Sequence, residues 1–264
     1  MLRGAWDREV RRDAVVTSER GHQLGVTLDP RRTSSASMTQ SGLAAFDHHN
    51  GLVTVPLPKD EGSVQVVSVI YNAAAPTEIV LELQIPHGAR SELQPDGSLF
   101  IVNEVGAFLG GVPPPWAVDA QGRDVNTQFT LSGNTLTQIV DHRVRDVTYP
   151  VIADPWLGAD LFSYTGYNRN GTFRSDLVIS AKLSGWGWYW YTTGSGQFIL
   201  RGAGWDELKA KRPRVTEKAT LRQQYDCHVT FGYAVWLAGL HWDLEKARAN
   251  KSDWLNTALT HRCN

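Results

Sequence analysis

The sequence predicts an α+β protein in which an antiparallel β-sandwich-like domain is followed by a small, disulfide-stapled α+β domain. Short segments of alternating apolar and polar residues, separated by turns, fill residues 51–155. Segments with helical spacing of apolar residues follow in the last third of the chain, which also holds both cysteines. Because 264 residues suffice for two domains, we expect one over 51–155 and one over 156–264.

Composition and charge exclude several classes of protein. A content of 42% hydrophobic and 20% charged residues is that of a globular chain, which excludes a disordered protein and a collagen-like repeat. The net charge of −1 argues against a general nucleic-acid binder. Residues 51–155 carry 5 basic and 12 acidic side chains, whereas residues 156–264 carry 14 basic and 9 acidic ones. This asymmetry favours two domains that attract each other or a basic domain with an anionic partner.

The first 50 residues predict a poorly ordered or loosely packed segment. Residues 29–41 have the polar, serine-rich composition of a loop. The chain starts with basic residues but lacks the run of roughly 7–15 apolar residues that completes a secretory signal. No apolar run approaches the roughly 20 residues of a membrane-spanning helix. We therefore expect a cytosolic protein, or a chain that begins downstream of a leader.

The region 51–155 has the pattern of short antiparallel strands. Residues 77–85 alternate, with Ile79, Leu81 and Leu83 on one face, which predicts a strand with one buried side. Turns containing glycine divide the following residues into further strands. The expected strands lie at 92–93, 99–102, 127–131 and 136–140.

Four phrases in this region carry a resemblance to a known module. They are Gln-Pro-Asp-Gly-Ser, Pro-Trp-Ala-Val-Asp-Ala-Gln-Gly-Arg, Asn-Thr-Leu-Thr-Gln-Ile-Val-Asp-His and, most specific, Tyr-Pro-Val-Ile-Ala-Asp-Pro at 149–155. Residues 65–155 resemble a β-rich module of secreted actinobacterial proteins of unknown function. The resemblance implies an extracytoplasmic setting and a supporting role rather than catalysis.

The composition changes after Pro155, since eight of the ten tryptophans lie in 156–264. Strands are expected at 176–183, 186–191 and 197–200. Three helices are expected: one over 205–212, a second that begins after an N-cap at Thr216, and a third over 253–261 with its N-cap at Ser252. The first helix has acidic residues in its first turn and basic residues in its last turn, which suits the helix dipole. The second has an apolar stripe at Leu221, Tyr225, His228 and Val229.

This second region resembles the family known as domain of unknown function 2599. The matching phrases are Gly-Trp-Asp-Glu-Leu at 204–208, Gln-Tyr-Asp-Cys-His-Val at 224–229, Trp-Asp-Leu-Glu-Lys-Ala-Arg at 242–248 and the closing Cys-Asn. One departure is Arg248-Ala249, where the family pattern has Arg-Pro. The resemblance covers about residues 200–264 and implies a secreted protein, without implying an activity.

Cys227 and Cys263 predict a disulfide, which would tie the second helix to the chain end. A nucleophilic Cys227 with His228 as base is an alternative, although neighbours on a helix point about 100° apart. A metal site is another alternative, although metal binding normally takes more ligands than Cys227, His228 and Cys263. The disulfide is the pairing we expect, with no metal and no cofactor.

The chain lacks the standard catalytic signatures, such as a Gly-x-Ser-x-Gly elbow or a phosphate-binding loop. His48-His49 has turn composition, and a metal site there is a minor alternative. Asp141-His142 is expected to be a surface or locally bonded pair at a strand end. The carboxylates that remain as candidates for glycan hydrolysis are Asp206, Glu207, Asp243 and Glu245, of which the first two are already explained by the helix dipole.

Three functions from different classes remain open. We favour a non-enzymatic binding module for a cell-envelope polysaccharide, located outside the cell or on its surface. The alternatives are a cell-wall glycan hydrolase, and a secreted effector with a basic nuclease-like domain that uses His228 or His241. If residues 186–191 form a strand, three indoles lie on one face and tyrosines on the other. The expected binding residues are therefore Trp186, Trp188, Trp190, Tyr189 and Trp205, with core packing of the indoles as the alternative.

Overall fold

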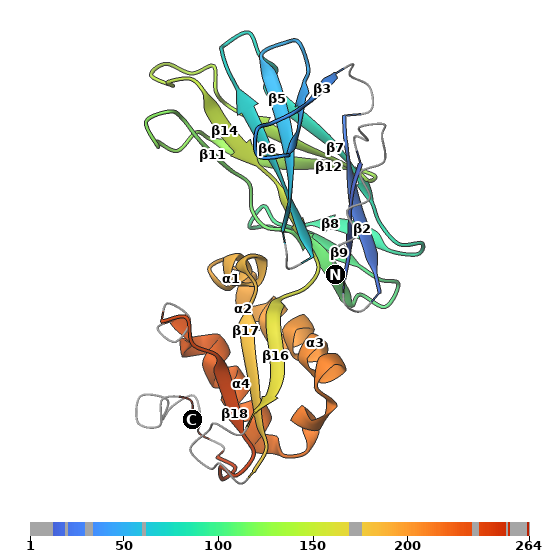
Figure 1. Cartoon of the computed structure of the whole chain (residues 1–264), viewed down its shortest axis with the longest axis vertical. Helices are drawn as coiled ribbons and strands as arrows, with labels where there is room; N and C mark the ends of the chain where they lie inside the picture. Colours follow the sequence, from blue (N-terminus) through green and yellow to red (C-terminus); the bar gives the residue numbers. More distant parts are fainter. Residues whose placement is uncertain are drawn as a thin grey trace. The chain divides into compact units, whose positions relative to one another are not determined.

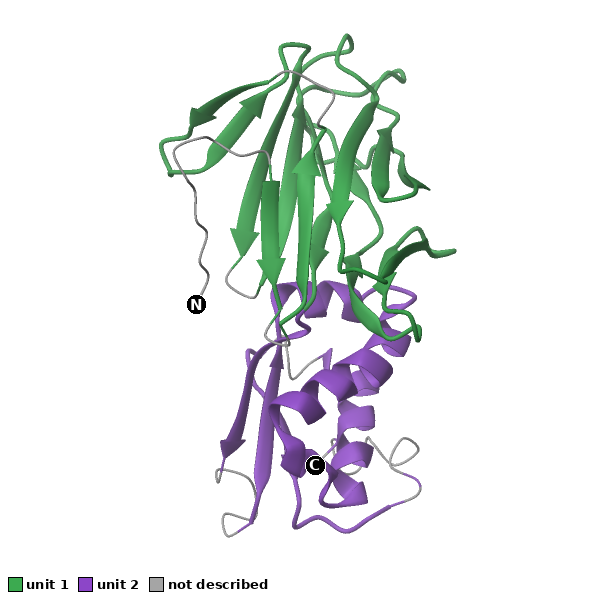
Figure 2. Cartoon of the chain, turned by 90° about the vertical axis from the view of Figure 1, so that its right-hand side faces the viewer, with its two compact units in different colours: residues 1–159 green, residues 160–264 purple. Residues whose placement is uncertain are grey.

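The computed structural model describes residues 13–18, 21–29, 34–59, 62–168, 176–233, 238–251, 253 and 263. The chain divides into two compact units, Met1–Ala159 and Asp160–Asn264 (Figure 2). This division lies close to the change of composition after Pro155. No helix among the described residues is long and apolar enough to cross a membrane.

The first unit consists of two antiparallel sheets, as the alternation of residues 51–155 predicted (Figure 1). One sheet has the strand order β1-β2-β7-β13-β12, and its strands are β1 (Asp13–Thr17), β2 (Gln23–Leu28), β7 (Glu78–Gln84), β12 (Thr127–Ser132) and β13 (Thr135–Val140). The main path of the other sheet is β3-β4-β5-β6-β15-β10-β9-β8, and β14 joins β11 to β6. Its strands are β3 (Ser35–Met38), β4 (Ala44–Asp47), β5 (Leu52–Lys59), β6 (Ser63–Ile70), β8 (Arg90–Leu93), β9 (Leu99–Val102), β10 (Phe108–Val112), β11 (Trp116–Val118), β14 (Val151–Asp154) and β15 (Trp156–Gly158).

The core of this unit lies between the two sheets. Leu81 and Leu83 of β7 are buried with Val64 and Val66 of β6, from the other sheet. The strand predicted over 77–85 is confirmed as β7, and the predicted hairpin around residues 132–134 is confirmed as β12 and β13. The predicted β-rich, antiparallel fold class is therefore confirmed.

The expectation that residues 1–50 are loosely packed is wrong for the part that the structure describes. Strand β2 pairs with β7, which places Leu24, Val26 and Leu28 in the core. The expected loop at 29–41 contains β3, which pairs with β4 although all its side chains are exposed. Strand β3 forms through backbone pairing with a neighbour, so its side chains carry no burial pattern that a sequence could show.

The second unit consists of a three-stranded antiparallel sheet and several short helices (Figure 1). The sheet order is β16 (Phe162–Asn168), β17 (Val178–Leu183) and β18 (Trp242–Glu245). The α-helices are α1 (Gly185–Tyr191), α2 (Gly196–Ile199), α3 (Trp205–Lys211) and α4 (Ala219–Phe231), with a π-helix over Leu200–Gly204 and a 3-10 helix over Pro213–Thr216. The predictions of a strand at 176–183 and of helices at α3 and α4 are confirmed.

The strand expected at 186–191 is wrong, because these residues form helix α1. The Ser184 hydroxyl caps the helix by accepting a hydrogen bond from the Gly187 backbone N–H at 2.8 Å. Trp186 and Trp190 are both fully buried and lie one helical turn apart, with ring centroids 5.8 Å apart. A side chain at Gly187 would overlap the carbonyl oxygen of Leu161, so this helix face requires glycine.

Three smaller predictions about the second unit differ from the structure or lie outside its described residues. Residues 197–200 are helical rather than a strand. The N-cap of α4 is Lys218, because Thr216 ends the preceding 3-10 helix. The helix expected over 253–261, with its cap at Ser252, lies outside the described residues apart from Asp253.

Asp154 of β14 makes the stability of the first unit depend on pH. Burial raises the pKa of Asp154 to about 6, although hydrogen bonding from Gln65 and the charge of Lys59 oppose the rise. The folded state therefore holds a proton that the unfolded chain releases near pH 3.8, and stability decreases as the pH rises from about 4 to about 6. The loss reaches about 3 kcal/mol, because each pKa unit corresponds to about 1.4 kcal/mol.

We predict that Asp154→Asn unfolds at a higher denaturant concentration than the unaltered protein at pH 8, and that this difference shrinks at pH 4. Asp119→Asn is the matched control, because hydrogen bonds from Arg123 and from three backbone N–H groups hold the pKa of Asp119 well below its usual range. Asp119→Asn is expected to destabilise the protein at neutral pH. An Asp154→Asn variant that loses stability equally at both pH values would contradict the prediction.

Candidate functional site

Two of the indoles expected to bind a ligand belong to the core of the second unit. Trp186 and Trp190 of α1 are each 0% exposed, and Trp242 of β18 is 2% exposed. The Trp242 ring packs against Tyr225 and His228 of α4, at centroid distances of 6.2 and 5.6 Å. The three indoles therefore do not line one face of a strand as expected. Trp186 and Trp190 are buried on one face of helix α1, and Trp188 is not among them.

Trp188 instead belongs to an aromatic cluster at the surface. Its ring stacks on Tyr191 with centroids 4.9 Å apart and an interplanar angle of 13°, and it lies 5.4 Å from the ring of Tyr233. Tyr233 is 52% exposed, whereas Trp188 and Tyr191 are half-buried. We call Trp188, Tyr191 and Tyr233 the Trp188 cluster.

The fold brings the Trp188 cluster together from two distant segments. Helix α1 supplies Trp188 and Tyr191, and the chain just after α4 supplies Tyr233. Burial raises the pKa of the Tyr191 phenol, and hydrogen bonding with the backbone of Gly232 and Tyr233 opposes the rise. The Tyr191 ring also lies 6.2 Å from that of Trp242, so the cluster rests on the aromatic core. No sequence pattern pointed to Tyr233, which lies far along the chain from Tyr191.

Tyr189 and Trp205 have different surroundings. Tyr189 is half-buried on α1, next to Trp188 in the sequence. The Trp205 ring lies 5.1 Å from the Tyr225 ring and 4.9 Å from the guanidinium of Arg222. Arg222 also pairs with Asp226 on the next turn of α4. The ring contacts described for Trp205 therefore join α3 to α4 and do not extend the Trp188 cluster.

The candidate carboxylates are engaged in separate structural contacts. Asp206 is exposed and pairs with Lys209 at 2.7 Å, whereas Glu207 is fully buried and pairs with Lys211 at 2.6 Å. The Asp243 carboxylate accepts a hydrogen bond from Ser180 on β17. Glu245 is buried and pairs with Arg248 at 2.7 Å. None of these contacts places two of the carboxylates in one cleft, which glycan hydrolysis requires.

The histidines also lie apart from one another. His228 is buried and stacks on Trp242, whereas His241 is exposed and stacks on Tyr164 at 4.8 Å. In the first unit, His142 is buried between the Tyr149 hydroxyl and the Pro76 carbonyl, and burial lowers the pKa of its imidazole. Within the described residues, no group of three or more His, Cys, Asp or Glu side chains is arranged to hold a metal ion.

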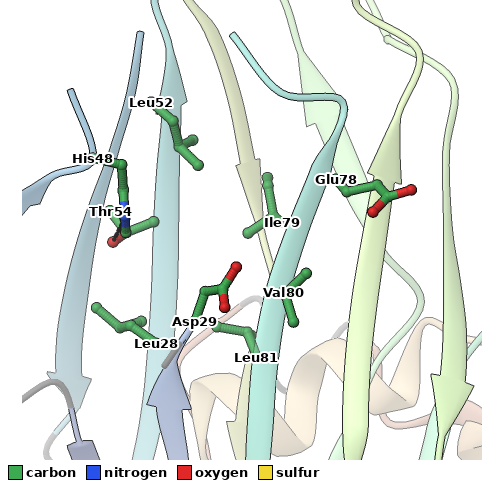
Figure 3. A pocket seen from close by; sticks show the side chains of 9 residues that line it. All are labelled: Leu28, Asp29, His48, Leu52, Thr54, Glu78, Ile79, Val80 and Leu81. Carbon is green, nitrogen blue, oxygen red and sulfur yellow. Dashed lines mark hydrogen bonds between the residues drawn. The ribbon is translucent and has the colours of Figure 1, made fainter. Parts of the chain in front are cut away.

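His48 and His49 do not form a joint site. His48 is buried, and its Nε2 lies 2.9 Å from the hydroxyl of Thr54, whereas His49 is exposed with a left-handed backbone. His48, just after β4, lines a pocket with residues of β2, β5 and β7, and Asp29 also lines it (Figure 3). The space open to the centre of a water molecule is about 10 Å³, which suits a single water rather than an organic ligand.

Most of the motif residues in the last part of the chain hold the second unit together. The side-chain amide of Gln224 accepts from the Glu245 backbone N–H at 2.8 Å and donates to the Glu245 carbonyl at 3.0 Å, as a neighbouring strand would. The hydroxyl of Tyr225 donates to the Leu200 carbonyl at 2.6 Å. Cys227 and Cys263 form the predicted disulfide, so the metal and nucleophile alternatives for Cys227 are excluded.

Comparison with known proteins bears on this same part of the chain. No curated protein and no solved structure matches the chain. Residues 194–264 match a family described as "Protein of unknown function (DUF2599)", which confirms the resemblance expected for residues 200–264. The matched region contains α3, α4, β18 and both cysteines. The motif residues in this matched region contribute Tyr225 and Trp242 to the aromatic core, form the disulfide and join α4 to β18.

Proposed function

We propose that the protein is a non-enzymatic binding module for a cell-envelope polysaccharide, with the Trp188 cluster as its binding surface. The observation that carries the proposal is the arrangement of Trp188, Tyr191 and Tyr233 at the surface of the second unit. Partly exposed aromatic rings with hydrogen-bonding N–H and O–H groups suit sugar rings, whose faces are apolar and whose edges are polar.

The packing beneath the cluster supports this function. The ring of the buried Trp242 lies 6.2 Å from that of Tyr191, and Trp186 and Trp190 are fully buried on the same helix as Trp188, so the surface rings adjoin a close-packed aromatic core. A surface that is already ordered loses less side-chain entropy on binding than a mobile one. The separate engagement of the four candidate carboxylates also favours binding over glycan hydrolysis.

The disulfide supports an extracellular or cell-surface location. Disulfides persist in oxidising compartments and are rare in the cytosol. Both cysteines of this protein are buried and bonded to each other. The expectation of a cytosolic protein is therefore the less supported of the two locations that the sequence left open.

Removal of rings from the cluster is expected to reduce retention on the polysaccharide. We predict that Trp188→Ala and Tyr233→Ala each weaken binding to purified, insoluble cell-wall polysaccharide by at least about fivefold, because a central aromatic contact contributes about 1 kcal/mol or more. Tyr71→Ala is the matched control, since Tyr71 lies in the first unit and is 54% exposed, against 52% for Tyr233. Co-sedimentation over a range of protein concentrations measures the affinity.

Each variant is first shown to be folded by its thermal unfolding curve and its circular dichroism spectrum. Undiminished binding by folded Trp188→Ala and Tyr233→Ala proteins would contradict the proposed surface. An equal loss in Tyr71→Ala would show that the assay does not report on the Trp188 cluster.

A further inference from the structure

On one face of the sheet of the second unit, the described residues include the exposed Tyr164 and His241 and the half-buried Lys182, whereas Ser180 on the same face is buried. Thr165, Ala181 and Trp242 lie opposite one another in neighbouring strands, and Trp242 packs on α1 and α4. Side chains alternate between the faces of a strand, so Tyr164, Lys182 and His241 project from the other face. In Figure 2 most helices of this unit lie to one side of its strands. We call Tyr164, Lys182 and His241, with Ser180 and Asp243 beside them, the open sheet face.

Two aromatic rings meet above the middle strand of this face. Tyr164 comes from β16 and His241 immediately precedes β18, and these strands flank β17 (Figure 1). The two rings nevertheless stack, with centroids 4.8 Å apart and an interplanar angle of 18°. Tyr164 is 45% exposed and His241 is exposed, so the stacked pair presents ring surface to solvent.

The position of Tyr164 depends on a glycine in the same strand. Gly166 lies two residues further along β16, on the same face, and a Cβ there would overlap the Tyr164 hydroxyl. Tyr164 follows an irregularity in the pairing of β16 with β17, where the Ser163 hydroxyl donates to the carbonyls of Lys182 and Leu183. These features hold the Tyr164 ring along the strand before any ligand arrives.

A cation lies beside the stacked pair. Lys182 pairs with Tyr164 across the two strands, so both side chains lie on the same face. Within the described part of the chain, no carboxylate lies within ion-pair distance of the half-buried Lys182. Asp243 lies on the same face, and its carboxylate accepts a hydrogen bond from the buried Ser180. Lys182 therefore offers a positive charge next to exposed ring surface.

We infer that the open sheet face is a second binding site, which takes an acidic sugar residue of a polysaccharide. Its sugar ring packs against the Tyr164–His241 pair, and its carboxylate or phosphate pairs with Lys182. The inference deepens the proposed function and rests on it, because it assigns an anionic polymer to a protein proposed to bind glycans. The excess of 14 basic over 9 acidic side chains in residues 156–264 favours the same class of polymer.

The test compares two polymers of the same sugar, one with free carboxylates and one with the carboxylates methyl-esterified and therefore uncharged. We expect the unaltered protein to bind polygalacturonate at least fivefold more tightly than fully methyl-esterified pectin, and we expect Lys182→Gln to abolish this preference. Lys209→Gln is the matched control, because it removes the same charge from helix α3 of the same unit. Phosphomannan and neutral mannan repeat the comparison with phosphate as the anion and show which of the two groups is preferred. Isothermal titration calorimetry at low and moderate salt gives the affinities.

Two further variants test the aromatic part of the site. Tyr164→Ala and Gly166→Ala are expected to weaken binding of charged and neutral polymers alike. Tyr164→Phe keeps the aromatic ring and is expected to bind both polymers as tightly as the unaltered protein does. Gly166→Ala leaves every polar group in place and moves only the Tyr164 ring, so its effect separates ring position from charge.

The outcomes distinguish this inference from the proposed function. An unchanged charge preference in Lys182→Gln, or an equal loss in Lys209→Gln, overturns the inference even if Trp188→Ala abolishes retention on cell walls. A charge preference that is retained in Trp188→Ala and Tyr233→Ala but lost in Lys182→Gln supports the inference. Undiminished retention on cell walls by the same two cluster variants would overturn the Trp188 cluster alone. If the unaltered protein binds a single-stranded oligonucleotide but neither acidic polysaccharide, the inference is overturned in favour of a nucleic-acid ligand. If the unaltered protein binds none of these polymers, the inference is overturned outright.

Discussion

Glu207→Ala is expected to destabilise the protein by about 3–5 kcal/mol, the usual cost of removing one partner of a buried ion pair. The Glu207 carboxylate is 0% exposed and accepts hydrogen bonds from the backbone N–H groups of Leu161 and Phe162, at 2.8 and 3.2 Å. It also pairs with the ammonium of Lys211. Its removal leaves the donors of Leu161, Phe162 and Lys211 without their acceptor, and those donors lose water on folding without compensation.

The neighbouring residue provides the control for this variant. Asp206 lies on the same turn of α3, but it is exposed and pairs with Lys209 at the surface. Asp206→Ala is therefore expected to change stability by less than about 1 kcal/mol. Urea unfolding followed by tryptophan fluorescence measures both variants. Equal effects of the two substitutions would contradict the structural role of Glu207.

Burial raises the pKa of Glu207, and the charge and hydrogen bond of Lys211 oppose this rise. Glu207→Gln keeps one acceptor oxygen and removes the charge, so it is expected to lose less stability than Glu207→Ala. A Gln variant as unstable as the Ala variant would show that the charge of Glu207, rather than its acceptor oxygens, is what the fold uses.

Loss of the disulfide is the other change with a large expected effect. Cys227 and Cys263 are 36 residues apart, and closing a loop of that length stabilises the folded state by about 4 kcal/mol. We predict that the double variant Cys227→Ala/Cys263→Ala loses stability of this size in urea unfolding. Alanine is the better replacement because both positions are buried, where a serine hydroxyl would need a partner.

Reduction of the unaltered protein tests the same bond without a substitution. Dithiothreitol is expected to raise the mass by two units and to lower the unfolding midpoint towards that of the double variant. The double variant itself should not respond to dithiothreitol. Labelling of both thiols in the unreduced, folded protein, or equal stability with and without the bond, would contradict the prediction.

The sequence by itself determined the elements whose signal is local. Alternation marked β7, and glycine turns marked the hairpin of β12 and β13. The charges at both ends of α3, and the buried stripe of α4 that includes Leu221 and Tyr225, also appear in the structure as predicted. The pairing of the two cysteines followed from their number and from the poor placement of any alternative partner.

Only the tertiary structure decided which aromatic residues reach the surface. Trp186 and Trp190 fit one face of a strand and one face of a helix equally well, since they are spaced by four residues. The Ser184 cap and the close approach of Gly187 to the Leu161 backbone select the helix, and burial of both indoles follows.

The binding surfaces likewise join segments that are far apart in the sequence. Tyr233 reaches Trp188 because α4 ends beside α1, and His241 reaches Tyr164 because β16 and β18 flank the same strand. Strand β3 forms in the same way, through pairing with β4 and without any buried side chain. A local sequence pattern indicates which side chains an element buries. Contacts between elements depend instead on which strands and helices become neighbours in the folded chain.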